Sequence, residues 1–267
     1  MDANRLWGIY GRHGMRLYGT DTFTGWANDR AFALLTGEPS LDLNICCLQP
    51  GATAGDAAAL LEVIDSVGAP TVVPVSTRAL GAAGERLRTA GFQPLGPEVA
   101  MWRPPGLPVE VAGPFEVRLA VTADELVAAD RVVAEAHGTV PGMLQRVFNL
   151  DAWRTGEVEC WMAWDAEEAA STGWITRGEG FLGVWEMMTS PRYRRRGAAR
   201  AILQHAMRVR AGGGPEGTLL WASPMGRPLY ESLGFVVFDE IVPWVRGGTN
   251  EELAAIGAVV QPRPGAG

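Results

Sequence analysis

Three features of the sequence predict a mixed α/β fold arranged as two tandem domains. Apolar runs typical of strands alternate with stretches whose apolar residues recur at the 3–4 spacing of helices. A Pro/Gly-rich joint beginning at Arg103 separates two such patterns in a chain of 267 residues, a length that suits two domains. Gly55 and Gly91 lie 36 positions apart, Gly197 and Gly234 lie 37 apart, and Phe follows each second glycine. We interpret this as a diverged internal duplication, although such units also recur by chance.

The first domain is predicted over residues 1–104. Its predicted elements are an apolar run at 41–48, helices at 57–67 and 79–90, and strands at 71–75 and 99–102. Before residue 41 the N-terminus mixes charged with apolar residues and lacks a secretory signal pattern.

The second domain is predicted over 115–246, after a linker at 105–114 and before a tail at 247–267. A strand at 115–121 precedes a helix that Thr122 caps, with Asp124 and Glu125 in its first turn. The elements predicted after it are a short helix at 141–150, strands at 160–164, 171–176 and 181–189, a helix from 198 to the glycines at 212–214, a strand at 218–222, a helix at 228–233 and a strand at 235–244.

Charge and cysteine content narrow the classes of function. A net charge of −7 argues against nucleic acid and against an anionic membrane surface as partners, and an acidic surface would tolerate or attract a cationic substrate. The three cysteines have no disulfide or zinc spacing, so we expect a reducing compartment, the cytoplasm, and no metal. No apolar run reaches 18 residues, which predicts no transmembrane helix.

The stretch from Trp185 to Gly197 carries the clearest functional signal. An apolar run ends at Pro191, three arginines and a glycine follow, and a helix pattern begins at Ala198. Unpaired backbone N–H groups and the positive end of a helix dipole bind anions, and a glycine lets the ligand approach closely. This turn therefore predicts a phosphate site, for which a pyrophosphate is the most natural ligand.

The chain from about residue 115 to 245 resembles the GNAT superfamily of acyl-CoA-dependent N-acyltransferases. Arg194-x-x-Gly197-x-Ala199 matches the family pattern Arg/Gln-x-x-Gly-x-Gly/Ala, and the run from Leu229 to Phe235 looks like its Leu-Tyr-x-x-x-Gly-Phe segment. The resemblance implies a GNAT-like fold with a splayed, mostly antiparallel central sheet. It also implies acetyl-CoA or another acyl-CoA as donor.

The resemblance assigns roles residue by residue. Tyr230 occupies the position whose phenol protonates the leaving thiolate, although its hydroxyl could be a spectator on a packed ring. Glu186 could take the proton of the attacking amine, or it could be a structural carboxylate. The residues expected to hold coenzyme A are Met187, Met188, Thr189, Arg194, Arg195, Arg196, Gly197, Ala198, Ala199 and Ser223, of which at least one arginine could simply be solvated.

Two positions depart from the family pattern. Ser223 stands where many relatives have asparagine, which shortens its reach, and Pro228 predicts a late start for the helix that carries the tyrosine.

In the first domain, Ala52 and Leu87 align with the positions of Arg194 and Tyr230. We therefore interpret that half as a degenerate GNAT-like domain that buttresses the active one or covers its acceptor cleft.

The sequence predicts an N-acetyltransferase that acts on a small-molecule amine by direct attack, as a monomer or homodimer. His137, Trp161 and Trp185 are candidates for the acceptor pocket; an aromatic ring there could contact an apolar, ring-bearing or cationic amine. Three alternatives stay open: transfer to a hydroxyl, decarboxylation of a malonyl-type acyl-CoA, and a CoA-binding sensor without activity.

Overall fold

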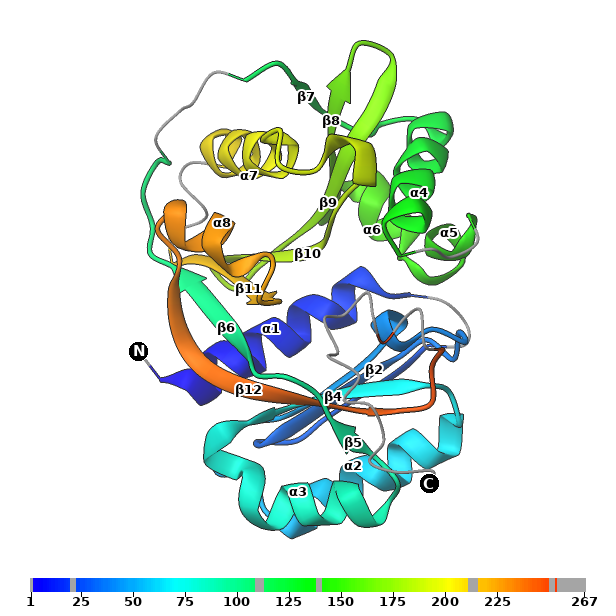
Figure 1. Ribbon diagram of the computed structural model, residues 1–267, viewed down its shortest axis with the longest axis vertical. Coiled ribbons are helices and arrows are strands. Elements are labelled where there is room, and N and C mark those ends of the chain that lie inside the picture. Colours follow the sequence, from blue (N-terminus) through cyan, green and yellow to red (C-terminus); the bar gives the residue numbers. More distant parts are fainter. Residues whose placement is uncertain are drawn as a thin grey trace, which may run out of the picture.

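The computed structural model describes residues 2–19, 23–108, 113–137, 141–210, 216–249 and 253. One large sheet extends through these residues, and helices pack against it (Figure 1). Its strand order is β1-β2-β3-β4-β12-β6-β11-β10-β9-β8-β7, with β5 beside β12. Among the strands described, β3–β4 and β10–β11 pair in parallel and the other neighbours are antiparallel. The predicted mixed α/β fold with a mostly antiparallel sheet is confirmed.

The N-terminal half begins with a helix that the sequence analysis did not predict. The elements of this half are α1 (Ala3–Leu17), β1 (Thr24–Ala27), β2 (Ala31–Leu35), η1 (Leu41–Leu43), β3 (Asn44–Leu48), α2 (Ala54–Val67), β4 (Thr71–Ser76), η2 (Thr77–Ala79), α3 (Leu80–Thr89), β5 (Gln93–Pro94) and β6 (Glu98–Arg103). A capping box between Thr53 and Asp56 starts α2, and Gly68 ends it at a φ of 72°. The helices and strands predicted after residue 41 are confirmed.

The C-terminal half follows the predicted order with two corrections. Its elements are β7 (Glu116–Leu119), α4 (Ala123–His137), α5 (Met143–Val147), α6 (Leu150–Thr155), β8 (Val158–Asp165), β9 (Glu168–Gly178), β10 (Phe181–Thr189), η3 (Pro191–Tyr193), α7 (Ala198–Val209), β11 (Gly217–Ala222), α8 (Arg227–Ser232) and β12 (Val236–Arg246). The helix predicted at 141–150 is the shorter α5, and an unpredicted helix, α6, follows it because Asn149 caps a new helix. The helix α8 does not start late: Pro228 fits its first turn, where a missing N–H costs no hydrogen bond.

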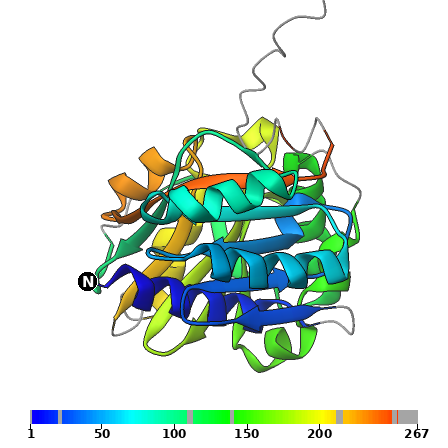
Figure 2. The same ribbon diagram turned by 90° about the horizontal axis from the view of Figure 1, so that it is seen from below.

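Strand alternation places α1 and α2 on opposite faces of β2. Phe32 and Leu34 pack in a core cluster with residues of α1, whereas Ala33 and Leu35 pack in another cluster with residues of α2. The helices α2 and α3 together cover the outer face of the N-terminal strands (Figure 2). The other face of these strands is therefore left for α1.

The helix α1 lies between the two halves. It contacts β2 of the N-terminal half and β9, β10 and β11 of the C-terminal half (Figure 1). The indole N–H of Trp7 donates to Asp239 at 2.8 Å, and the His13 ring lies 2.7 Å from the Thr176 hydroxyl. These buried polar contacts tie the first helix of the chain to strands more than 150 residues later.

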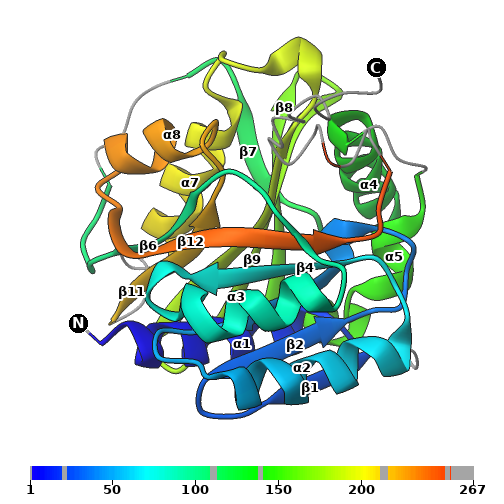
Figure 3. The ribbon, with the colours of Figure 1, turned by 60° about the horizontal axis from the view of Figure 1, so that its bottom comes forward.

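The two halves exchange their last strands. The strand β6, from the N-terminal half, lies between β11 and β12, with Leu219 opposite Trp102 and Val236 also opposite Trp102. The strand β12 then leaves β6 and pairs with β4, where Val242 lies opposite Val75 (Figure 3). A chain division at residue 104 therefore separates β6 from the strands with which it pairs.

The two halves also end their last helices alike. The N–H of Phe92 donates to the carbonyl of Leu87 at 3.0 Å, and the N–H of Phe235 donates to the carbonyl of Tyr230 at 3.1 Å. The glycine before each Phe adopts a left-handed conformation, with φ of 86° and 85°. Leu87 and Tyr230 thus occupy equivalent places in the two halves.

Candidate active site

The strands β10 and β11 pair briefly and then separate. Their parallel pairing covers Phe181–Gly183 and Gly217–Leu219. Beyond it, β10 stays with β9 while β11 continues with β6 as far as Ala222. Backbone groups of β10 beyond Gly183 thus lose one neighbouring strand. A cavity of about 950 Å³ opens here between the two strands.

A β-bulge in β10 turns Glu186 toward this cavity. Trp185 lies opposite Trp174 and Met188 lies opposite Thr172, so Glu186 and Met187 both lie opposite Gly173. Glu186 has a φ of 43°, a conformation that is strained for a residue with a side chain. Its carboxylate lines the cavity, as do the predicted donor-site residues Met187, Met188 and Thr189.

The open edge of β10 can bind an extended ligand arm. The carbonyl of Met188 accepts a hydrogen bond from the Ser171 hydroxyl at 2.6 Å and so faces β9. Because neighbouring residues of a strand direct their backbone groups to opposite sides, those of Met187 and Thr189 face away from β9. The Thr189 carbonyl, for example, accepts from Arg194 Nε at 3.4 Å.

The start of α7 forms the other end of the cavity. Gly197 is its N-cap with a φ of 93°, and the carbonyl of Gly197 accepts from the N–H of Ala201 at 2.9 Å. The first N–H groups of a helix have no intrahelical acceptor, and the helix dipole favours an anion beside them. Gly197, Ala198 and Ala199 all line the cavity. The start of α7 therefore has the shape and polarity that an anion site requires.

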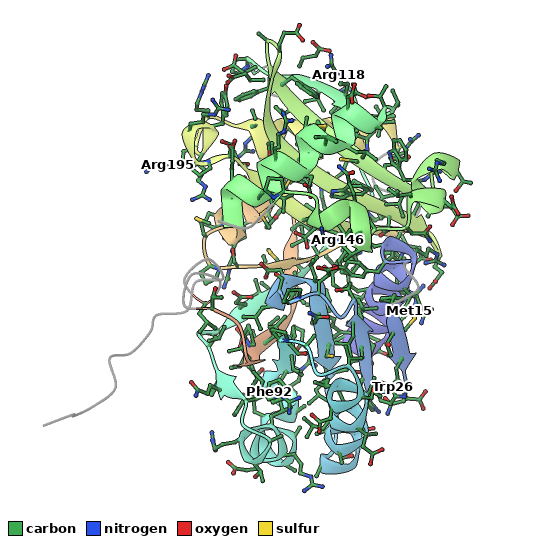
Figure 4. All side chains as sticks on the ribbon, turned by 90° about the vertical axis from the view of Figure 1, so that its right-hand side faces the viewer. Met15, Trp26, Phe92, Arg118, Arg146 and Arg195 are labelled. Atoms are coloured by element: carbon green, nitrogen blue, oxygen red, sulfur yellow. The ribbon has the colours of Figure 1, made fainter. Side chains whose placement is uncertain are left out.

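The three consecutive arginines have different surroundings. Arg194 lines the cavity and donates to the carbonyl of Ala136 at 3.3 Å. Arg195 also lines it and lies at the outer edge of the C-terminal half (Figure 4). Arg196 turns away: it pairs with Asp165 at 3.0 Å, lies over the ring of Tyr193, and is not a cavity-lining residue. Arg196 therefore lies away from the cavity in which the donor is expected to bind.

Tyr230 reaches the cavity from α8. Its side chain is 7% exposed, and its ring packs edge-on against Phe235 with centroids 5.7 Å apart. Burial raises the pKa of the Tyr230 phenol to about 12, so the group keeps its proton at neutral pH. Ser223 lines the same wall, and its hydroxyl accepts from the N–H of Gly226 at 3.3 Å, which shapes the turn before α8.

The residues at the end of the cavity beside α1 include Tyr10, Asp42, Glu98 and Trp221, which the sequence analysis missed. The helical pattern of α1 was a signal that could have led to Tyr10. No local signal points to Asp42 or Glu98, because the exchange of strands and the parallel packing of β3 on β4 bring them here.

Tyr10 closes the fork between the two diverging strands. Its hydroxyl donates to the carbonyl of Val184 on β10 at 3.5 Å and also interacts with the backbone of Trp221 on β11. Burial raises the pKa of Tyr10 well above its usual value, and the neighbouring Glu186 and Tyr230 add to the effect. Tyr10, Glu186 and Tyr230 therefore share one electrostatic environment.

Glu98 is a buried carboxyl at this end. It is 8% exposed and accepts a hydrogen bond from the indole N–H of Trp221. Burial raises the pKa of Glu98 to about 8 and the charge of Asp42 acts in the same direction, whereas the indole hydrogen bond opposes both.

The three residues expected in the acceptor pocket differ in where they lie. Trp185 lines the cavity and donates from its indole N–H to Thr176 at 2.9 Å. Trp161 does not line it: alternation on β8 turns this ring into the core under α7, beside His205. The side chain of His137 lies outside the part of the chain that the structure describes, as do the glycines at 212–214 and most of the predicted tail.

Among the described residues, no group of three or more His, Cys, Asp or Glu side chains is arranged to hold a metal ion. Within the same residues, none of the helices combines the length and the apolar character needed to cross a bilayer.

Part of the sequence matches a family of known proteins. Residues 156–237 match the family model described as "Acetyltransferase (GNAT) domain". No curated protein matches the sequence.

Solved structures share the fold over most of the chain. A GCN5-related N-acetyltransferase from Kribbella flavida is similar with a TM-score of 0.64 at 16% identity, covering 92% of this chain and 96% of that one. One from Sphaerobacter thermophilus has a TM-score of 0.56 at 17% identity over 83% and 79% of the two chains. A tandem GNAT protein from the clavulanic acid biosynthesis pathway has a TM-score of 0.51 at 11% identity over 90% and 89%.

Proposed function

We infer that the protein transfers the acetyl group of acetyl-CoA to the amine of a small molecule. The premise is the match of residues 156–237 to the GNAT acetyltransferase family. One observation carries the proposal: the α7 start, the open edge of β10, Glu186 and Tyr230 all line a single cavity. An anion site, a backbone edge, a carboxylate and a protonated phenol are the groups that such a transfer needs.

The residues of the cavity fit coenzyme A. A side-chain carbon added at Gly197 would meet no atom within 4 Å, so there is room for phosphate oxygens beside the helix start. The N–H groups of Gly197 to Ala199 and the Arg194 guanidinium would hold the pyrophosphate. The backbone groups of Met187 and Thr189 would bind the pantetheine arm, which directs the thioester toward Glu186 and Tyr230.

The transfer forms a C–N bond and breaks a C–S bond at the acyl carbon. Glu186 takes the proton that the amine loses, directly or through water, and Tyr230 gives a proton to the leaving thiolate. Solvent then returns both groups to their starting states, so the products are the amide and free coenzyme A. The phenol is a hydrogen-bond donor throughout the neutral range, since burial holds its pKa at about 12.

Direct attack on the thioester agrees with the state of the cysteines. Cys46, Cys47 and Cys160 are buried, and burial raises the pKa of each thiol, in Cys160 to about 12. A protonated, inaccessible thiol is a poor nucleophile. The protein therefore has no cysteine suited to carry an acetyl group between donor and acceptor.

The test combines binding with turnover. Calorimetry should detect coenzyme A binding to the wild-type protein, and release of free thiol from acetyl-CoA should depend on an added amine from a mixed panel. Because the chain contains no lysine, intact-mass analysis has little background from acetylated ε-amines. Malonyl-CoA without an amine tests decarboxylation, and a hydroxyl panel tests O-transfer. Coenzyme A binding without turnover on any of these would favour a sensor.

A further inference from the structure

Three carboxylates line the end of the cavity beside α1, and they come from three separate elements. Asp42 lies in η1, Glu98 opens β6, and Glu186 lies on the bulge of β10. The arginines that line the cavity, Arg194, Arg195 and Arg200, belong to the loop before α7 and to its first turn. The cavity is thus cationic where the donor phosphates would bind and anionic at the other end.

Glu98 is a buried carboxyl, and its charged form needs a positively charged partner. Its hydrogen bond comes from the neutral indole of Trp221, and no ion pair reaches it from the residues that the structure describes. A buried carboxylate is stable when a cation balances it and otherwise tends to remain protonated. A positively charged ligand group beside Glu98 would supply that balance.

Aromatic rings surround the same end. Tyr10, Trp185 and Trp221 line the cavity next to the carboxylates. Aromatic faces attract cations, and a low-dielectric wall strengthens the attraction to a nearby carboxylate. Rings and carboxylates together favour an alkyl ammonium group over a neutral or an anionic group.

We propose that this acidic end, built by Asp42, Glu98 and Glu186, selects an amine that carries a second positive charge. The reacting amine lies toward Glu186 and Tyr230, and the second cation lies toward Glu98 and Asp42. The N-terminal half thereby sets acceptor specificity for a reaction whose donor site is in the C-terminal half. The inference rests on the proposed function, since it names the substrate class of the same site.

Three probes of equal chain length test the proposal: 1,4-diaminobutane, 1-aminobutane and 4-aminobutanoate, which end in a cation, a methyl group and an anion. With saturating acetyl-CoA, kcat/KM for the diamine should exceed that for 1-aminobutane about tenfold or more, with 4-aminobutanoate slowest. In Glu98→Gln, which keeps the shape and an acceptor for Trp221, and in Asp42→Asn, the diamine-to-monoamine ratio should fall toward one. Asp151→Asn, an exposed carboxylate of α6 paired with Arg154, is the matched control and should keep the ratio.

The outcomes separate this inference from the proposed function. Acetylation of all three probes at similar kcat/KM would overturn the inference and leave the transferase intact. A ratio unchanged by both Glu98→Gln and Asp42→Asn, in variants that still bind coenzyme A, would also overturn it. If no amine is acetylated, calorimetry of 1,4-diaminobutane with the CoA-loaded protein decides: binding that Glu98→Gln weakens supports the acidic site, and no saturable binding refutes it.

Discussion

The ring of Tyr10 stacks on the ring of Trp185, with centroids 4.1 Å apart and 11° between the planes. Tyr10 comes from the first helix of the chain and Trp185 from the residue before the Glu186 bulge. The stack therefore joins the helix between the two halves to the strand that carries the candidate base. It fixes one wall of the cavity at the point where β10 and β11 separate.

Truncation of this stack should damage both stability and acceptor binding. Tyr10→Ala removes a buried ring and should lower the free energy of unfolding by about 3 kcal/mol and raise the amine KM. Tyr10→Phe keeps the stack and loses only the hydroxyl's interactions with the Val184 carbonyl and the Trp221 backbone, so its cost should be smaller, about 1–2 kcal/mol. Denaturant unfolding and steady-state kinetics measure the two effects. Equal behaviour of the two variants would show that the stack has no such role.

Tyr230→Phe should lower kcat about 100-fold, because the variant cannot protonate the leaving thiolate. The dissociation constant of coenzyme A should change little, since the ring and its packing on Phe235 remain. Tyr18→Phe is the matched control: it removes another buried hydroxyl, one without a hydrogen-bond partner in the part described. Full activity in Tyr230→Phe would remove the phenol from the mechanism.

The pH profile gives a second check on the phenol. Because the pKa of Tyr230 is raised to about 12, the proton donor stays intact up to about pH 10, and kcat should not fall in the basic range. A falling limb between about pH 7 and 9 that disappears in Tyr230→Phe would contradict this assignment.

The proposed donor half of the site follows from local sequence signals, whereas the proposed acceptor half does not. The Gly197 turn and Tyr230 each lie within a short segment whose spacing predicts its structure. Helix α1 was missed because Gly8, Gly11 and Gly14 interrupt its helical pattern. Two of these glycines allow close approach of the sheet: an added carbon would lie 2.8 Å from Phe32 at Gly11 and 2.2 Å from Leu34 at Gly14.

Strand exchange explains why Glu98 was missed. Glu98 opens a strand that the sequence predicts correctly, but nothing near it indicates that this strand pairs with β11. When the two halves are aligned, Ala52 and Leu87 stand at the positions of Arg194 and Tyr230. The alignment therefore shows only which site residues the N-terminal half lacks. What that half contributes, Tyr10, Asp42 and Glu98, lies outside the aligned positions.

Comparison of Arg194→Ala with Arg196→Ala tests which of these two arginines binds coenzyme A. Arg194 lines the cavity, and its loss should weaken coenzyme A binding about tenfold at low salt, with a smaller difference at high salt because salt screens the contact. Arg196 pairs with Asp165 on the surface, and its loss should leave the dissociation constant near the wild-type value. Calorimetry at two salt concentrations measures both. An equal loss in the two variants would restore a donor role for Arg196.

Protonation of His13 should destabilise the fold in mild acid. Burial lowers the pKa of His13 to about 4, and Arg16 adds to the shift, while the Gly178 carbonyl and Glu179 oppose it. Because the folded pKa lies below the unfolded value of 6.5, the stabilisation is complete above pH 6.5 and is lost as the pH falls toward 4. Between pH 6.5 and 4, the free energy of unfolding should fall by up to about 1.4 kcal/mol per pH unit.

Urea unfolding of the wild type and of His13→Gln, compared at each pH, isolates this contribution from the carboxylates that titrate nearby. The variant should show the flatter dependence between pH 6.5 and 4. Parallel curves for the two proteins would mean that His13 does not carry the effect.

Selectivity for the dicationic amine should increase with pH through the titration of Glu98. Burial raises the pKa of Glu98 to about 8, with Asp42 acting in the same direction and the Trp221 indole against it, so the carboxyl becomes charged as the pH rises past 8. Alkyl amines stay largely protonated up to about pH 10, so the ligand keeps its second charge in this range. The ratio of kcat/KM for 1,4-diaminobutane to that for 1-aminobutane should therefore rise between about pH 7 and 9. Below about pH 9 the neutral fraction of the reacting amine rises in parallel for the two substrates, so its pH dependence cancels in this ratio. Glu98→Gln should give a ratio that is low and independent of pH, and a wild-type ratio that stays constant would show that Glu98 does not sense the second charge.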